Sequence, residues 1–371
     1  MGTDSIIYIR TDGNSKIATG HLVRCICIAQ ALESLEKKVC FLVSDHTSAD
    51  LLKDLSSSIF PRYTFSIDVQ ILRTAFYNNM ESELAELQSL LTNKTNDTDR
   101  ANSNLIKPVV FVDSYYVTSN YLSTLRTFAH VAYMDDLRAF EYDVDLVINY
   151  DVIPVSKQKE YAQAYANIPT TLLGAGYTPL RRQFQNKEVT LSNTFQNVLI
   201  TSGGSDPYRF TELLASYLLS QNLEITLHIV VGKLFTNTKE LESLASNNSA
   251  ICLHYNVSDM ASLMKQCDYA VSAAGTTLYE LCALGIPCIS FSMAENQKIM
   301  AETFSDTGAV PYAGDIQNKS SEDIHFILTN IKIHLISLSR DSSKRMAQHK
   351  IMRELVDGCG AVKIAERLCK L

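Results

Sequence analysis

The sequence predicts an α/β protein built from two doubly wound domains, each a parallel sheet with helices on both faces. Short runs rich in β-branched residues alternate with stretches of helical periodicity, the pattern of parallel strands joined by crossover helices. This series ends near Asn149 and starts again at Val198, after a polar stretch of mixed composition. The length of 371 residues also favours two domains, because one domain usually holds about 100–200 residues.

The predicted strands are short apolar runs bounded by turn-forming residues. The segments predicted to be strands are 6–9, 39–43, 109–112, 130–134, 146–149, 198–201, 226–231, 251–254, 269–272 and 288–291. Helices are predicted to begin near Gly20, Glu81, Asn120, Asp206, Lys239, Ser258, Thr276 and Gln297. A further helical region is expected from about Ser321 to the C-terminus, with a break near Asp357. The polar stretch 92–104 is predicted to be a solvated loop of the first domain.

These elements predict a first domain over 1–180, a second over 195–350 and a C-terminal helix over 351–371. The segment near 180–195 is expected to be the linker. Ligands of doubly wound sheets bind beyond the carboxyl ends of the strands. We therefore expect the functional site in a cleft between the two domains.

The composition is that of an ordinary globular protein and excludes several classes of partner. Apolar residues make up 46% and charged residues 20% of the chain, which excludes a mainly disordered protein. The net charge of −7 leaves no basic field for nucleic acid or an anionic membrane. No apolar run approaches the roughly 20 residues that a membrane span needs, and the N-terminus does not have the pattern of a signal peptide.

The nine cysteines are scattered, odd in number and without a C-x-x-C pair, which argues against a zinc site or a disulfide framework. We expect a cytoplasmic protein that uses no metal and no cofactor, acts on a small molecule, and is a monomer or a weak homo-oligomer. Without a basic surface, a phosphate-bearing ligand must be held by local backbone donors.

Two glycine-containing turns in the second domain are candidate anion sites. In VLITSGGSDPYRF, a strand ends at Thr201, and Gly203 and Gly204 precede a predicted helix with Asp206 as N-cap and Pro207 in its first position. Glycine lets backbone N–H groups face an anion and the helix N-terminus adds partial positive charge, so a diphosphate fits here. A plain strand–helix turn is the alternative, because two adjacent glycines alone are weak evidence.

The second turn, in DYAVSAAGTTLYELCALGIPCISF, places Gly275 between a strand and a helix that Gly285 and Pro287 end. Glu280 falls between one and two turns into this helix, where a carboxylate can accept both hydroxyls of a ribose whose phosphates lie at the helix start. A solvent-facing helical Glu is the alternative. Two turns of this kind within one domain favour a nucleotide.

The first domain carries a histidine at a similar position. Gly20 and His21 follow the first strand at a helix start, where the helix dipole disfavours the cationic imidazole. A neutral imidazole is what a general base needs. A histidine that only caps or packs is the more common case, but the loop after the first strand faces the ligand edge of the sheet.

Two further polar pairs follow predicted strands. Asp135 and Asp136 resemble a carboxylate pair for metal or acid chemistry, but a turn or N-cap role is preferred because no third ligand is near. Asn296 and Gln297 lead into a helix and could either bind phosphate or sugar or simply cap that helix.

In this order and spacing, these segments together resemble the UDP-sugar hydrolases of the pseudaminic-acid pathway. Those enzymes act on UDP-2,4-diacetamido-2,4,6-trideoxy-β-L-altropyranose and belong to the GT-B superfamily, which includes the UDP-GlcNAc transferase of peptidoglycan synthesis. The family start, R-x-D-x-x-x-x-I-G-x-G-H-x-x-R-C, is similar to RTDGNSKIATGHLVRC here. Further matches are DDLRAFEYDVDLVINYD, LLGAGYTPLRRQF, SGGSDP, SAAGTTLYELCALGIP, AENQ and the tail MRELVDGCGAVKIAERL. The resemblance covers nearly the whole chain and implies a GT-B-like fold of two Rossmann-like domains.

The resemblance also implies a role for each matching residue. His21 matches the family's catalytic histidine, the base that activates water, and Glu280 matches the ribose-binding carboxylate. Gly20, Gly204 and Ser205 match positions beside the diphosphate. The other residues placed at the substrate are Val257 and Met260 of the uracil-reading loop, Asn296 and Gln297 on the sugar side, Tyr115, Tyr177 and Arg181 near the sugar or the domain junction, and Asp12, Arg24, Thr276 and Thr277.

Three positions depart from the family pattern. Ala18 replaces the first Gly of I-G-x-G-H, Val23 replaces a Met, and Ser114 replaces the His of a D-H-Y motif near the sugar. The mechanism implied is cleavage of the anomeric C–O bond by water with inversion, releasing UDP and a free sugar for nonulosonic-acid synthesis. A glycosyltransferase using the same UDP site and a non-catalytic UDP-sugar-binding protein are the alternatives.

Overall fold

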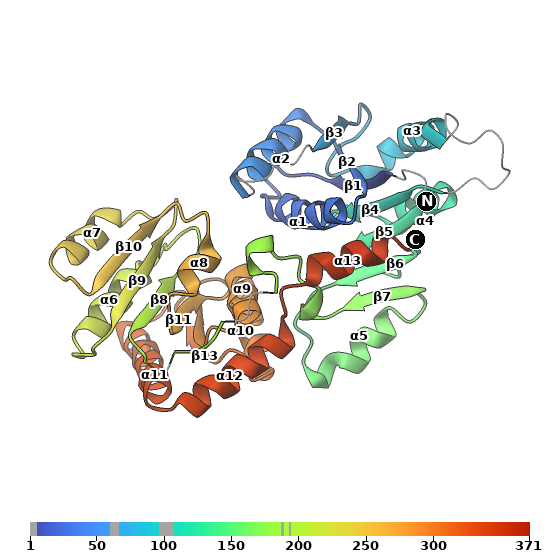
Figure 1. Ribbon diagram of the computed structural model, residues 1–371. Helices are drawn as coiled ribbons and strands as arrows, with labels where there is room; N and C mark the ends of the chain where they lie inside the picture. The colour runs from blue at the N-terminus through green and yellow to red at the C-terminus, as the bar shows by residue number, and fades with distance from the viewer. Residues whose placement is uncertain (1–5, 60–66, 96–106, 187–188, 193) are drawn as a thin grey trace. The chain divides into compact units, whose positions relative to one another are not determined.

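The computed structural model describes residues 6–59, 67–95, 107–186, 189–192 and 194–371. The chain forms two compact units, unit 1 with Met1–Arg181 and Cys359–Leu371, and unit 2 with Arg182–Gly358. Each unit contains one parallel sheet with helices on both faces (Figure 1). The sequence predicts a separate C-terminal helix over 351–371, whereas the structure divides this segment between the two units.

Unit 1 has a seven-stranded sheet in the order β3-β2-β1-β4-β5-β6-β7. Its strands are β1 Ile6–Thr11, β2 Lys38–Val43, β3 Asp68–Ile71, β4 Val109–Asp113, β5 His130–Met134, β6 Leu146–Asn149 and β7 Thr170–Leu173. Because β1 lies between β2 and β4, the crossover connections leave it in opposite directions. Such a reversal is the point at which doubly wound sheets bind ligands, beyond the carboxyl ends of the strands.

Helices cover both faces of the unit 1 sheet (Figure 1). On one face, α1 (Gly20–Ser34), α2 (His46–Ile59) and α13 (Gly360–Leu368) form one apolar core with the strands. On the other face, α3 (Leu84–Thr95), α4 (Ser119–Phe128) and α5 (Gln158–Ala164) form a second core. The buried residues of α13 recur at helical spacing and pack against α1, which ties the end of the chain to unit 1. Short 3-10 helices span Met80–Glu83 (η1), Val155–Lys157 (η2) and Ala175–Tyr177 (η3).

Unit 2 has a six-stranded sheet in the order β10-β9-β8-β11-β12-β13. Its strands are β8 Asn197–Thr201, β9 Thr226–Val231, β10 Ile251–Tyr255, β11 Tyr269–Ala273, β12 Cys288–Ser292 and β13 Tyr312–Asp315. Its helices are η4 Arg182–Phe184, α6 Phe210–Leu219, α7 Thr238–Ser246, α8 Met260–Met264, α9 Thr276–Leu284, α10 Glu295–Asp306, α11 Ser321–Arg340 and α12 Ser342–Leu355. The main apolar core lies between the sheet and α6, α7 and α11. The switch point of this sheet is at β8, between β9 and β11.

Every segment predicted to be a strand is a strand in the structure. Sequence reasoning missed β3, β7 and β13, which have four residues each and are mostly half-exposed, so that they show neither an apolar run nor a clear alternation. It also missed α2 and α5.

The predicted helix start at Asp206 is wrong, because α6 begins at Phe210. The C-terminal helical region breaks also at Asp341, whose side chain caps α12. Of the predicted loop 92–104, residues 92–95 belong to α3 and the rest lies outside the described residues.

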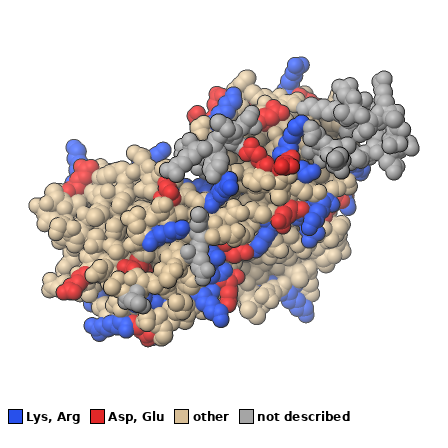
Figure 2. All heavy atoms as spheres, in the orientation of Figure 1, with Lys and Arg blue, Asp and Glu red and all other residues tan. Residues whose placement is uncertain are grey.

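No helix in the described part of the chain is both long and apolar enough to cross a membrane. Figure 2 shows Lys and Arg side chains interspersed with Asp and Glu on the visible face, without a single broad basic patch.

A buried ion pair fixes the end of β1 from which the loop to α1 departs. Arg10 donates from Nε and Nη2 to the two carboxylate oxygens of Glu83, at 2.7 and 2.8 Å, and from Nη1 to Asp12 at 2.6 Å. Arg10 and Glu83 are both fully buried, and the Tyr121 hydroxyl also donates to Glu83 at 2.8 Å. Charges in such a place are tolerated only when each one is paired.

We expect Glu83→Gln to lower the free energy of unfolding by about 3–5 kcal/mol, because it leaves Arg10 in the interior with one carboxylate fewer. The matched change Glu160→Gln breaks a surface ion pair with Arg138 and should cost no more than about 1 kcal/mol. Denaturation in urea measures both differences. Equal effects of the two substitutions would contradict this role of Glu83.

Candidate functional site

The carboxyl ends of β1 and β4 bring a histidine, an arginine and an aspartate together in unit 1. His21 and Arg24 lie at the start of α1, which begins at Gly20. Asp113 is the last residue of β4, and the register of the parallel pair sets it beside Thr11 at the end of β1. Because α1 starts at the switch point of the sheet, its first residues contact the carboxylate that ends the neighbouring strand.

Asp113 accepts hydrogen bonds from His21 and Arg24, and from the Cys25 thiol at 3.3 Å. Its Oδ1 lies 2.6 Å from His21 Nδ1, while Arg24 donates from Nε to Oδ2 at 2.6 Å and from Nη2 to Oδ1 at 2.5 Å. A carboxylate can only accept, so His21 Nδ1 carries the hydrogen, and a neutral ring then has a bare Nε2. The 3.0 Å approach between Arg24 Nη2 and His21 Nδ1 follows from both groups donating to the same oxygen.

The negative charge of Asp113 is stable although the side chain is buried. Burial by itself raises the pKa of the Asp113 carboxyl, but the Arg24 guanidinium and the contact with His21 lower it, and the net result is a pKa well below the ordinary value. Arg24 also donates to the Tyr150 hydroxyl at 2.6 Å and lies 2.8 Å from Asp136. These partners hold Arg24 in place, and Arg24 keeps Asp113 ionised beside the imidazole.

An aromatic side chain, Tyr115, lies next to His21. The Tyr115 ring contacts the imidazole edge-on with a centroid distance of 4.4 Å, and the residue as a whole is 46% exposed. Burial and the neighbouring Asp136 raise the pKa of the Tyr115 phenol, so it stays protonated at neutral pH. Tyr115, which the family resemblance places near the sugar, is therefore in direct contact with the candidate base.

The loop between β1 and α1 is held by its own short-range contacts. The Asn14 side chain accepts the N–H groups of Lys16 and Ile17 at 2.8 and 3.2 Å. Ala18 has a φ of 56°, a left-handed conformation that glycine adopts at lower cost. The glycine of the family pattern at this position therefore has a conformational reason. A Cβ at Gly20 would meet only open space.

In unit 2, the start of α9 is open to an anion. β8, β11 and β12 are consecutive in the sheet, so the residues that follow them lie at one edge. α9 begins at Thr276, and its N-cap Gly275 supplies no side-chain hydrogen bond. The first N–H groups of this helix thus have no capping side chain at that position and suit a phosphate. Thr276 is exposed and Thr277 is half-buried at this helix start.

The helix that follows β8, α6, does not have a helix start that is open to an anion. The buried Asp206 accepts the N–H groups of Phe210 and Thr211 at 2.9 and 2.8 Å, so its carboxylate already occupies the start of α6. The N–H groups of Phe210 and Thr211 are therefore engaged by Asp206, and the diphosphate site at this turn stays a prediction. The preceding loop remains available, because Gly204 and Ser205 are exposed and a Cβ at Gly204 would meet nothing within 4 Å.

The other predicted contacts in unit 2 follow strands of the same sheet. Val257 is half-buried after β10, and Met260 is the buried first residue of α8. Glu280 is half-buried on α9, about one turn from the open helix start. Asn296 is exposed on α10, while Gln297 is half-buried and accepts the Met293 N–H at 2.9 Å, which is a capping contact.

The remaining predicted residues of unit 1 lie in other surroundings. Asp12 is buried, accepts from Arg10 and receives the Ser44 N–H at 2.7 Å, so both of its oxygens are engaged. Tyr177 is half-buried and packs against the core that contains α13. Arg181 is half-buried at the end of the first segment of unit 1.

The two aspartates after β5 have different roles. Asp135 is buried and accepts the N–H groups of Leu137 and Arg138 at 2.9 Å each, which agrees with the turn role preferred from the sequence. Asp136 instead pairs with Arg24. The described residues contain no group of three or more His, Cys, Asp or Glu side chains that could hold a metal ion.

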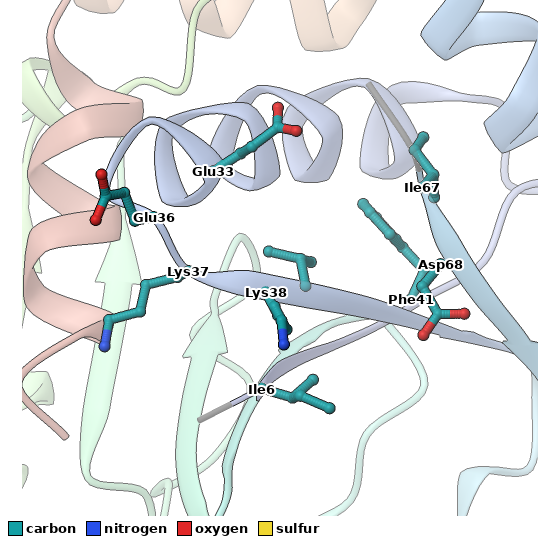
Figure 3. Close-up of a pocket in the computed structure, with 9 residues that line it drawn as sticks. Ile6, Glu33, Glu36, Lys37, Lys38, Phe41, Ile67 and Asp68 are labelled. Carbon is teal, nitrogen blue, oxygen red and sulfur yellow. The ribbon is translucent and has the colours of Figure 1, made fainter. Parts of the chain in front are cut away.

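A separate cavity of about 360 Å³ lies at the opposite edge of the unit 1 sheet (Figure 3). Its lining includes Ile6 at the start of β1, Lys38 at the start of β2 and Asp68 at the start of β3. These are amino ends of strands, so the cavity is not part of the His21 cluster, which lies at the carboxyl ends.

Curated relatives match parts of the chain, and no family profile matches it. The spore coat polysaccharide biosynthesis protein SpsG of Bacillus subtilis is 29% identical over 195 residues, or 52% of this chain and 56% of that protein. An uncharacterized protein of Methanocaldococcus jannaschii is 26% identical over 302 residues, 79% of this chain and 56% of that protein. A Helicobacter pylori protein, named pseudaminic acid cytidylyltransferase and UDP-2,4-diacetamido-2,4,6-trideoxy-beta-L-altropyranose hydrolase, is 31% identical over 141 residues, 37% of this chain and 24% of that protein. The chain thus spans about half the length of the first two relatives and a quarter of the third.

Solved structures of low sequence identity share the fold. MurG of Acinetobacter baumannii has a TM-score of 0.63 with 13% identity, covering 99% of this chain and 100% of that one. A UDP-GlcNAc 2-epimerase of Neisseria meningitidis has a TM-score of 0.61 with 14% identity and the same coverage. The chain has a GT-B-like fold. The predicted fold class of two Rossmann-like domains is therefore confirmed.

Sequence reasoning missed Asp113 and Tyr150 of the His21 cluster, and it gave Asp136 a turn or N-cap role rather than a contact with Arg24. Asp113, Asp136 and Tyr150 each follow or end a strand of unit 1, but they are far from His21 along the chain. The available signal was position, because carboxyl ends of neighbouring parallel strands meet at one edge. Only the strand order of the sheet shows that β4 is the neighbour of β1.

We expect Asp113→Asn to change the tautomer of His21. Arg24 would take the single amide oxygen, so the amide NH₂ would face His21 Nδ1 and move the ring hydrogen to Nε2. Nitrogen-15 NMR of histidine-labelled protein distinguishes the two tautomers. Asp136→Asn, which also removes a charge beside Arg24, should leave His21 in the Nδ1–H form. An Nε2–H ring in the unmodified protein would contradict the geometry described above.

Proposed function

We propose that the protein hydrolyses a UDP-2,4-diacetamido-2,4,6-trideoxyhexose to UDP and the free sugar. The observation that carries this proposal is the His21 imidazole, whose Nδ1 is bound to an ionised carboxylate. His21 donates from Nδ1 to Asp113, and Nε2 has no hydrogen bond with any described residue. A ring held in this way keeps Nε2 free to take a proton from water.

The proposal that the protein binds UDP rests on features of unit 2. The open start of α9 and the exposed loop at Gly204 and Ser205 follow neighbouring strands, and both suit a diphosphate. Glu280 lies about one turn along the same helix, at the place where a ribose would follow the phosphates. The similarity to SpsG and to the Helicobacter pylori hydrolase supports this sugar-nucleotide class and the diacetamido-trideoxy sugar.

The reaction needs one base and a stabilised leaving group. Water attacks the anomeric carbon, His21 Nε2 takes its proton, and the anomeric C–O bond breaks so that its electron pair leaves with UDP. Backbone N–H groups at the helix start stabilise the charge on the departing diphosphate. Asp113 and Asp136 are both paired with Arg24, so neither acts as a carboxylate nucleophile, and inversion at the anomeric carbon follows.

His21→Ala should lower turnover of the UDP-sugar by about 10²–10⁴-fold, the contribution of a positioned general base. UDP binding should be retained, because the start of α9 and the loop at Gly204 lie in unit 2 and the substitution leaves the backbone at Gly20 in place. Proton NMR of the products follows UDP and free reducing sugar, and calorimetry measures UDP binding.

The matched control is His46→Ala, which removes an exposed histidine at the start of α2, also after a strand of unit 1. It should keep full turnover. Turnover of His21→Ala near that of the unmodified protein would remove His21 from the mechanism. UDP-sugar consumption only in the presence of an added acceptor would instead indicate a glycosyltransferase.

A further inference from the structure

The turn that follows β9 is packed against the loop proposed to hold the diphosphate. β9 pairs with β8 so that Val230 is the partner of Thr201, and the residues after both strands meet at the sheet edge. A Cβ at Gly232 would lie 2.4 and 2.5 Å from the carbonyl oxygens of Gly203 and Gly204. Only glycine allows the two backbones to approach so closely.

Hydrogen bonds fix this turn in place. The Leu234 N–H donates to the Gly204 carbonyl at 3.0 Å, and the Phe235 N–H donates to the Gly232 carbonyl at 3.2 Å. Phe235 is buried in the core of unit 2 and anchors the turn. The Gly204 carbonyl is thus directed to the β9 turn, where its oxygen cannot repel an anion bound to the loop. Lys233 is held at the tip of this turn.

Lys233 differs from the other basic residue in the connections that follow β8, β9, β11 and β12. The segments that connect β8, β9, β11 and β12 to their next helices contain two basic residues, Arg209 and Lys233. Arg209 is paired with Glu212 at 2.9 Å and with Glu240 at 3.1 Å. Lys233 is exposed and has no ion pair or hydrogen bond with any described residue. Its four-carbon stem carries a compact positive charge that can follow a phosphate.

We propose that Lys233 binds the diphosphate of the nucleotide and neutralises the charge that builds up on it as the sugar leaves. This inference rests on the proposed function for the identity of the ligand. The backbone N–H groups bind the phosphates through directional hydrogen bonds. Lys233 adds a full positive charge, the only one that these connecting segments leave unpaired. In a chain with a net charge of −7, a local cation adds attraction for the diphosphate to that of the backbone donors.

The test compares UDP and UMP binding by calorimetry for Lys233→Met and for Lys239→Met. Lys239 is an exposed lysine on α7 of the same unit, so both variants change the net charge equally. Lys233→Met should weaken UDP binding by about 5–20-fold and UMP binding much less, with a smaller salt dependence. Lys233→Arg should recover most of the affinity, and Lys239→Met should bind both ligands as the unmodified protein does.

The outcomes separate this inference from the proposed function. If the unmodified protein binds UDP and Lys233→Met binds it equally well, the role of Lys233 is overturned and the hydrolase proposal is untouched. If the unmodified protein does not bind UDP, both proposals fail. Hydrolysis is measured on the same preparations. If Lys233→Met loses UDP affinity but neither the unmodified protein nor any variant hydrolyses the UDP-sugar, the role of Lys233 stands and the proposed hydrolase activity is contradicted.

Discussion

The ion pair between Arg24 and Asp113 is the interaction on which the candidate site depends. It keeps a buried carboxylate charged, and that carboxylate holds His21 by Nδ1. Without Arg24, burial would favour the neutral acid, which would no longer accept the imidazole hydrogen in the same way. Asp136 and Tyr150 hold Arg24 from the other side. The base is thus supported by partners from three different strand ends of unit 1.

Much of the architecture was predictable from the sequence, because parallel strands buried on both faces appear as apolar runs between helical stretches. The short strands β3 and β13 were not predictable, since each has only four residues, three of them half-exposed, and shows no periodicity. The start of α6 was misplaced because Asp206 has the chemistry of an N-cap, but it caps the helix from four residues upstream. Local propensity cannot distinguish these two positions.

The candidate site was predictable where one segment carries the signal, as for His21 and Gly275. The site was not predictable where it depends on which strands are neighbours in the sheet. Asp113 becomes a partner of His21 only through the pairing of β4 with β1, and Gly232 touches the Gly204 loop only through the pairing of β9 with β8. In both units the candidate site residues lie near the switch point of the sheet, where the fold brings distant segments of the chain together.

The most direct test of this account is the position of oxygen-18 after turnover of a UDP-2,4-diacetamido-2,4,6-trideoxyhexose in labelled water. If His21 directs water to the anomeric carbon, the label enters C1 of the free sugar, UDP stays unlabelled, and the first sugar formed has the inverted anomeric configuration. Label in the phosphate of UDP would show cleavage of the P–O bond, and it would contradict a base that acts on water at the sugar.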